Sequence, residues 1–150
     1  MLYLYHATYR CYLDSILKYG LRCGNNKHNF SDSDDCIYLA LDATAAYDYA
    51  ETGLDEWEDD DFTEDDDSAY DIVVLRIPYD KLSFDYFSYD WNNICDDWED
   101  INSCIYTQNI PPNYIKIVNN VYSEPEQTIE DFEDTELGEA LIDCWKEYGS

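Results

Sequence analysis

The chain has 150 residues, enough for one domain with a hydrophobic core. Its 35 acidic and 8 basic residues give a formal net charge of −27, which excludes non-specific binding to nucleic acid or to anionic membrane surfaces, because both depend on Lys and Arg. A hydrophobic content of 45% with 16 tyrosines excludes a disordered polyanion, so we expect a folded protein that attracts a basic partner.

The N-terminal segment predicts a strand followed by a helix. Residues 2–5 form a short apolar and aromatic run that we expect to be a strand ending at His6. Residues 11–19 carry apolar side chains at helical spacing, and Gly20 stands where a C-terminal cap belongs.

A second strand and helix are predicted after a polar loop. Residues 24–35 are rich in Asn, Ser and Asp, which indicates the loop. The apolar run over 36–40 predicts a short buried strand. Asp42 then stands as the N-cap of an alanine- and tyrosine-rich helix that runs to about residue 51.

Residues 51–71 form an acidic insert. Twelve of these 21 residues are acidic and none is basic, so their mutual repulsion predicts a solvated loop. Trp57 and Phe62 interrupt the charges, which an inert spacer would not need. The insert has two interpretations: a solubilising loop, or a surface of carboxylates that mimics nucleic-acid phosphates and steers a basic partner toward the chain.

The C-terminal half predicts several strands and a closing helix. Four apolar runs predict strands, over residues 72–77, 82–91, 104–107 and 115–118. Apolar residues at helical spacing predict one acidic helix over 128–148, with Thr128 and Asp131 as its N-terminal cap. The order of the elements predicts a single α+β domain over residues 1–150.

The sequence predicts neither a membrane span nor a metal site. No apolar run approaches the roughly 20 residues that cross a bilayer, and the N-terminus does not have the pattern of a signal peptide. The six cysteines are spread singly, which favours reduced thiols and an intracellular protein. Cys23 and His28 have no second pair of ligands at zinc-like spacing.

Three blocks occur in an order that resembles a known family. They are LYHAT at 4–8 before the first helix, IYLA at 37–40 before the second helix, and the strand over 103–107 that runs into Ile-Pro-Pro at 110–112. Together they resemble the diphtheria-toxin and poly(ADP-ribose) polymerase branch of the ADP-ribosyltransferases, whose hallmark is a His, a Tyr and a Glu. The resemblance implies a split β-sheet core with flanking helices and a C-terminal helix.

The resemblance also implies a binding site for NAD. His6 stands where the family histidine bonds the nicotinamide ribose. Ala7 and Thr8 stand where the following backbone holds the carboxamide, with Ala7 in place of the usual glycine and Thr8 in the place of a small hydroxyl residue.

Aromatic residues of the second block complete the implied pocket. Tyr38 matches the tyrosine that stacks on nicotinamide, and Tyr49 matches the second tyrosine, which covers the other face of the ring; Tyr47 is the alternative to Tyr49. Ala46 stands where polymerase-type members often place a serine that bonds the carboxamide oxygen.

The sequence departs from the family pattern at the position of the expected catalytic glutamate. Counting back from the Ile-Pro-Pro turn, its position falls on Ser103, or on Cys104 if the loop is one residue shorter. Glu99 and Asp100 can serve only if the strand begins differently. A carboxylate normally stabilises the oxocarbenium-like ribose of this chemistry, so the resemblance supports a fold and a pocket better than a working enzyme.

Two functions from different classes are expected. The first is a mono-ADP-ribosyltransferase that uses NAD, with His6, Tyr38 and Ser103 at the catalytic positions, to modify or inhibit a basic, nucleic-acid-handling protein. The second is a non-catalytic acidic inhibitor that mimics nucleic acid on the same scaffold. By analogy, the small size, the charge and the Asn-, Ile-, Tyr- and Asp-rich composition suit a phage-encoded factor directed against a host nuclease or CRISPR complex.

Overall fold

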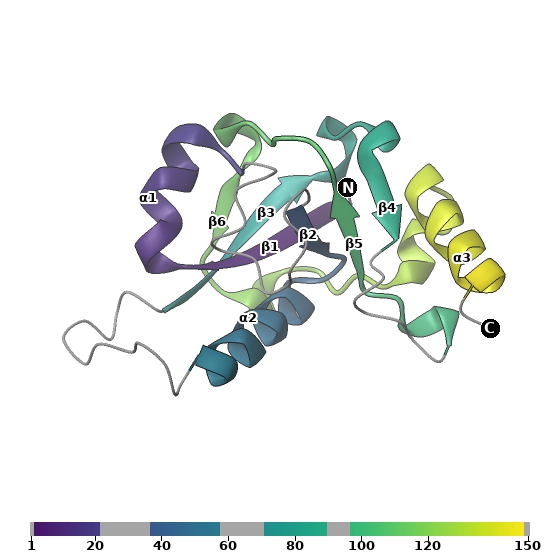
Figure 1. Ribbon diagram of the computed structural model, residues 1–150, viewed down its shortest axis with the longest axis horizontal. Coiled ribbons are helices and arrows are strands. Elements are labelled where there is room, and N and C mark those ends of the chain that lie inside the picture. Colours follow the sequence, from purple (N-terminus) through teal and green to yellow (C-terminus); the bar gives the residue numbers. More distant parts are fainter. Residues whose placement is uncertain (1, 22–36, 58–70, 90–96, 149–150) are drawn as a thin grey trace.

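The computed structural model describes residues 2–21, 37–57, 71–89 and 97–148. Within these ranges the strands form one antiparallel sheet in the order β4-β5-β2-β1-β3-β6, with helices around it (Figure 1). The arrangement confirms the predicted α+β class. The strands are β1 (Tyr3–Tyr9), β2 (Ile37–Ala40), β3 (Ile72–Pro78), β4 (Phe87–Tyr89), β5 (Ser103–Tyr106) and β6 (Lys116–Val118). The α-helices are α1 (Arg10–Tyr19), α2 (Ala43–Trp57) and α3 (Glu136–Tyr148).

Short 3-10 helices connect these elements. The two that matter below are η5 (Trp98–Asp100), which precedes β5, and η8 (Ile129–Phe132), which precedes α3. The others are η3 (Tyr79–Lys81), η4 (Phe84–Tyr86), η6 (Pro112–Tyr114) and η7 (Val121–Ser123).

Alternation along β1 divides the core into two clusters. Leu4 belongs to a large buried cluster that also holds Ile16 of α1 and Leu141 of α3. Tyr5 and Tyr9 belong to a smaller cluster on the other face, where α2 packs its small residues Ala43, Ala46 and Ala50. The face toward α2 therefore allows a close approach of helix and sheet, and we term it the α2 face.

β1 is longer than the sequence predicted. We expected the strand to end at His6, but β1 runs to Tyr9 and pairs with β3 along its whole length, from Tyr3–Pro78 to Tyr9–Ile72. His6 and Thr8 are polar residues in the middle of this strand, and both are buried. Because buried strand positions are seldom polar, these two residues indicated an end where the structure has none.

Both predicted caps in the N-terminal half are confirmed. Gly20 has a φ of 83°, and a Cβ at this position would lie 2.1 Å from the carbonyl oxygen of Ile110, so only glycine fits. Asp42 accepts a hydrogen bond from the backbone N–H of Thr44 at 3.2 Å. α2 runs past residue 51 to Trp57, so the acidic insert begins as helix; its residues 58–70 lie outside the described residues.

The predicted helix over 128–148 consists of two elements. Thr128 and Asp131 form the predicted capping box, but the element that follows it is η8, and α3 begins only at Glu136. Thr135 starts the second element, because its Oγ1 accepts a hydrogen bond from the backbone N–H of Gly138 at 3.1 Å. The apolar spacing continues across the break, which is why the sequence predicted one helix.

Of the four strands predicted in the C-terminal half, three are confirmed and one is mostly wrong. The predicted strands over 72–77, 104–107 and 115–118 correspond to β3, β5 and β6. The predicted strand over 82–91 is wrong for most of its described length, because η4 occupies its middle and only Phe87–Tyr89 pairs with β5.

Candidate functional site

β1 and β2 diverge around a single pair of residues. Within the described ranges they pair only at Tyr5–Ala40, whereas β1 pairs with β3, and β2 with β5, along their whole lengths. We term the gap between residues 3–8 of β1 and residues 37–41 the β1–β2 fork. It lies at the centre of the sheet, where an unpaired backbone needs other hydrogen-bonding partners.

Gln127 supplies partners on one side of the fork. Its buried side chain accepts a hydrogen bond from the backbone N–H of Tyr3 at 3.1 Å and donates to the carbonyl oxygen of Tyr3 at 2.7 Å. The same amide also donates to the carbonyl oxygen of Leu41 at 2.6 Å. The Gln127 side chain thus replaces the missing ladder between the two strands.

His6 connects the strands on the other side of the fork. Its Nδ1 lies 2.8 Å from the carbonyl oxygen of Tyr38, so two of the predicted site residues are in direct contact. Because a carbonyl oxygen only accepts hydrogen bonds, Nδ1 of His6 carries a proton and donates to it.

Tyr49 contacts Asn102, the residue that precedes Ser103 and β5. The Tyr49 hydroxyl, on α2, donates to Oδ1 of Asn102 at 2.5 Å. The backbone of Asn102 is also fixed, because its carbonyl oxygen accepts from the N–H of Leu41 at 2.8 Å. Ser103 follows directly and pairs with Ala40 of β2. Asn102 thus joins α2 to the end of β2, a contact that the sequence did not indicate.

Strand alternation sets the face on which each side chain lies. Ser103 is the register partner of Ala40, so these two residues and Tyr38 share the α2 face. His6 alternates with Tyr5 and therefore lies on the opposite face. The His6 ring accordingly contacts the backbone carbonyl oxygen of Tyr38, inside the fork, and not the Tyr38 side chain.

The remaining predicted cofactor positions are buried beside the fork. Ala7 and Ala46 lie in the cluster between the sheet and α2, with Tyr47 half-buried against it. Thr8 alternates with Ala7 and therefore lies on the opposite face, with His6; it is only 2% exposed, and its hydroxyl has no hydrogen-bond partner among the described residues. A buried hydroxyl in that state carries a desolvation cost that a bound polar group would offset.

The alternatives for the catalytic carboxylate lie in different surroundings. Cys104 is fully buried in the large cluster on the face opposite α2. Glu99 and Asp100 are exposed on η5. Ser103, which is 6% exposed, is the candidate that shares a face with Tyr38.

A charged cluster supports the start of β1, next to Gln127. The Tyr5 hydroxyl donates to Oε1 of Glu124 at 3.0 Å, and Nη1 of Arg76 lies 3.3 Å from the same oxygen. The Arg76 guanidinium also stacks over the ring of Tyr3, 4.6 Å from its centroid. Burial and the hydrogen bond to Glu124 raise the pKa of Tyr5.

Replacing Tyr5 with phenylalanine is expected to lower the free energy of unfolding at pH 7 by about 2 kcal/mol, because Glu124 loses a charged hydrogen bond. The folded-state pKa of Tyr5 lies above its ordinary value of 10.0, so the contribution of Tyr5 is present below that pH and is lost as the pH rises further. Urea unfolding at about pH 7 and pH 10.5 should show a smaller difference between wild type and Y5F at the higher pH.

The control for this experiment is Tyr122→Phe, because Tyr122 is 82% exposed. It should leave the free energy of unfolding unchanged at both pH values. A difference between wild type and Y5F that stays constant with pH would contradict the role given to Tyr5.

Other features of the described residues lie outside the fork. Of the cysteines in the described residues, Cys11 is exposed, Cys144 is half-buried and Cys104 is buried. The described part of the chain holds no group of three or more His, Cys, Asp and Glu side chains placed to bind a metal ion. Among its helices, none combines the length and the apolar character that a membrane span requires.

Comparison with known proteins leaves the fork and its residues as the basis for assigning a function. No protein-family model matches the sequence, and no curated protein matches it at a significant level.

Proposed function

We propose that the chain is a mono-ADP-ribosyltransferase-like intracellular protein that binds NAD at the β1–β2 fork and acts on a basic, nucleic-acid-handling protein. The observation that carries the proposal is the order of the strands. β1, β2 and β5 are consecutive neighbours in the sheet, and they hold His6, Tyr38 and Ser103. The α2 helix adds Tyr49 beside the start of β5.

Two groups of residues would contact a nicotinamide dinucleotide at the fork, His6 and Thr8 from one face of the sheet and Tyr38, Tyr49 and Ser103 from the α2 face. The Thr8 hydroxyl is buried without a partner in the described part of the chain, and the carboxamide group of nicotinamide can both donate to it and accept from it. The His6 ring, which the carbonyl oxygen of Tyr38 holds through Nδ1, would lie beside the nicotinamide ribose. Bound NAD would supply a ribose whose bond to nicotinamide breaks with oxocarbenium character.

Ser103 determines how much catalysis we expect from this site. A carboxylate at this position would stabilise the developing positive charge, and a serine hydroxyl carries no charge to do so. We therefore propose NAD binding with slow transfer of a single ADP-ribose unit. The net charge of −27 favours a basic protein as the acceptor, because it attracts such a partner and repels nucleic acid.

NAD is expected to raise the thermal unfolding midpoint of the wild-type chain, because a ligand that binds the folded state stabilises it. His6→Ala and Tyr49→Ala should abolish this shift, and Tyr122→Ala should keep it because Tyr122 is 82% exposed. Mass spectrometry of a basic target incubated with NAD should then detect one added ADP-ribose. The proposal fails if neither NAD nor nicotinamide shifts the midpoint of the wild type.

A second candidate is a non-catalytic inhibitor that mimics nucleic acid with its carboxylates. The observation that favours it is the absence of an acidic side chain at Ser103 together with the charge of −27. Such an inhibitor should compete with DNA or RNA for its partner without NAD, and competition should weaken at high salt. Replacing the acidic residues of 55–67 with amides would also weaken it, whereas His6→Ala would not.

A further inference from the structure

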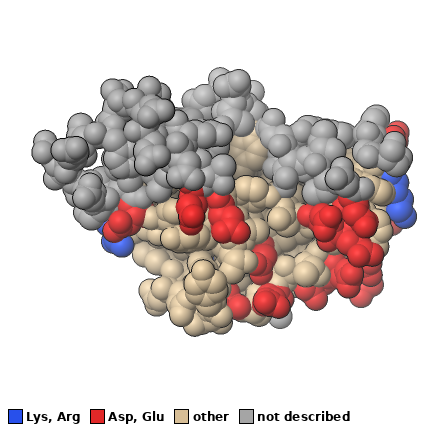
Figure 2. Space-filling view, turned by 90° about the horizontal axis from the view of Figure 1, so that it is seen from below, with Lys and Arg blue, Asp and Glu red and all other residues tan. Residues whose placement is uncertain are grey.

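Exposed carboxylates gather at the end of the molecule that holds α3 (Figures 1 and 2). The segments 97–100 and 129–147 contain eleven acidic residues, all exposed, and one basic residue, Lys146. This surface belongs to elements that do not form the β1–β2 fork. A field of this sign steers basic segments of other proteins toward η5, η8 and α3.

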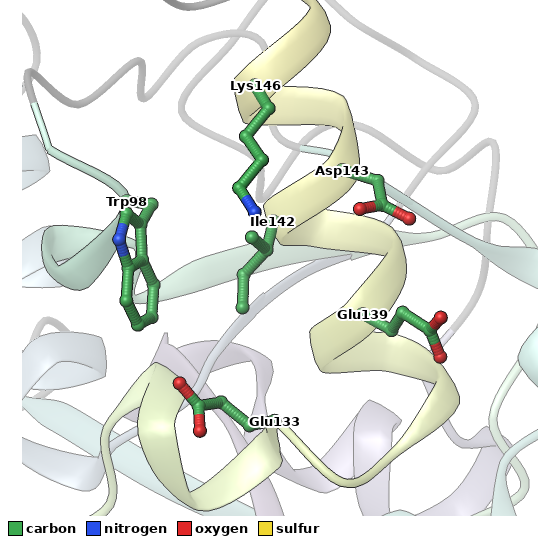
Figure 3. A pocket seen from close by; sticks show the side chains of 6 residues that line it. All are labelled: Trp98, Glu133, Glu139, Ile142, Asp143 and Lys146. Atoms are coloured by element: carbon green, nitrogen blue, oxygen red, sulfur yellow. The ribbon is translucent and has the colours of Figure 1, made fainter.

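A groove lies within this acidic surface. It has a volume of about 300 Å³ and contains apolar as well as charged side chains. Its lining residues are Trp98, Glu133, Glu139, Ile142, Asp143 and Lys146 (Figure 3). The groove is thus more than a cluster of acidic residues, because an indole and an aliphatic side chain form part of its walls.

Trp98 and α3 form the two walls of the groove. Figure 3 shows Ile142 and Lys146 on the side of α3 that faces Trp98, with Glu133 below the indole, whereas Glu139 and Asp143 lie on the other flank of the helix. Trp98 is half-buried and packs against the large core cluster, which holds its ring in place.

A fixed indole with a carboxylate beside it is suited to a guanidinium group. The planar guanidinium stacks on an aromatic face and at the same time donates two hydrogen bonds to a carboxylate. A lysine ammonium lacks the planar group and is more strongly hydrated, so it gains less from the indole.

We propose that this groove binds an arginine side chain of a basic segment in a partner protein, with the guanidinium on Trp98 and paired with Glu133. The surrounding carboxylates attract the other basic residues of the segment. Lys146 opposes binding, because it lines the same groove and carries the same charge as the incoming guanidinium. The inference shares the basic partner with the proposed function but needs neither NAD nor the fork.

The test measures binding of a fluorescent Arg-Gly repeat peptide to the full chain by anisotropy, with a Lys-Gly peptide of equal length as comparison. Trp98→Leu should weaken the Arg-Gly complex about three- to ten-fold, which corresponds to a cation–π contact of intermediate strength. Glu133→Gln should weaken it several-fold. Lys146→Ala should strengthen it, because a competing cation is removed, and the Lys-Gly peptide should bind more weakly than the Arg-Gly peptide.

The matched control is Glu51→Gln, which removes one exposed charge from α2. If Glu51→Gln weakens binding as much as Glu133→Gln while Trp98→Leu has no effect, the general field binds the peptide and the groove proposal is overturned. Weaker binding by Lys146→Ala would overturn it as well. Displacement of the peptide by an equal concentration of spermine would assign the groove to a polyamine rather than to a protein segment.

Two further measurements keep the outcomes separable. The unfolding midpoint of Trp98→Leu shows whether the variant folds, and Lys146→Ala tests the groove without altering the core because Lys146 is exposed. Both variants should retain the shift of the unfolding midpoint by NAD. If Trp98→Leu loses peptide binding but keeps the NAD shift, the result tests the groove alone. Loss of the NAD shift in His6→Ala tests the fork alone.

Discussion

Gln127→Leu is expected to lower the free energy of unfolding by about 3–6 kcal/mol, the largest effect of any single substitution considered for stability. The side chain makes three hydrogen bonds at the β1–β2 fork, to both backbone groups of Tyr3 and to the carbonyl oxygen of Leu41. Leucine fills a similar volume but leaves these backbone groups without partners, and each such loss costs about 1–3 kcal/mol.

Urea unfolding monitored by tryptophan fluorescence measures the effect of Gln127→Leu. Gln108→Leu is the matched control, because Gln108 is exposed and accepts only from the backbone N–H of its neighbour Asn109 among the hydrogen bonds described. It should change the free energy of unfolding by less than about 0.5 kcal/mol. Equal losses for the two variants would mean that Gln127 does not join the strands of the fork.

Ser103→Glu is expected to raise the rate of nicotinamide release from NAD by about 100-fold over wild type, the largest expected effect on activity. The substitution places a carboxylate on the face shared by Ala40 and Tyr38, where the proposed site has no charge to stabilise a ribosyl cation. Because Ser103 is 6% exposed, burial should raise the pKa of the new carboxyl group. The rate should therefore increase with pH as that group ionises.

The control for the charge is Ser103→Gln, which has nearly the same size as the glutamate variant and no charge. It should release nicotinamide no faster than wild type. Glu99→Gln and Asp100→Asn should leave the wild-type rate unchanged, since both residues are exposed on η5. Equal rates for the Glu and Gln variants at position 103 would show that the catalytic position lies elsewhere.

The parts of the fold that the sequence predicted correctly depend on local chemistry. Gly20 and Asp42 end and begin helices through contacts within a few residues, so their identities are readable in the sequence. The errors arose where a contact with a residue far along the chain determines the local structure. His6 and Thr8 remain inside β1 because β3 pairs with them, at Leu75 and Val73, and nothing near them in the sequence indicates this pairing.

The roles of the predicted site residues stay predictions, but the structure shows where these residues lie. The family resemblance associated His6 with Tyr38; in the structure the His6 ring contacts the backbone carbonyl oxygen of Tyr38, and the two side chains lie on opposite faces of the sheet. The sequence did not indicate the contacts of Asn102 or Gln127, because no local sequence pattern predicts which distant group an amide side chain will bind. Tyr49 lies 53 positions from Asn102, and Gln127 lies 124 positions from Tyr3. The Thr135 cap was missed for a different reason, since the apolar spacing around it was continuous.

The central place of β1 has a consequence for synthesis of the chain on the ribosome. Both neighbours of β1 follow it in sequence, and its longest pairing waits for β3, at Ile72–Pro78. Until that segment has emerged, the nascent strand exposes two unpaired edges, a state that favours self-association and slow folding. The many carboxylates translated in the meantime would keep neighbouring nascent chains apart. The charge that we propose to attract a cationic target would thus also protect the protein before it is folded.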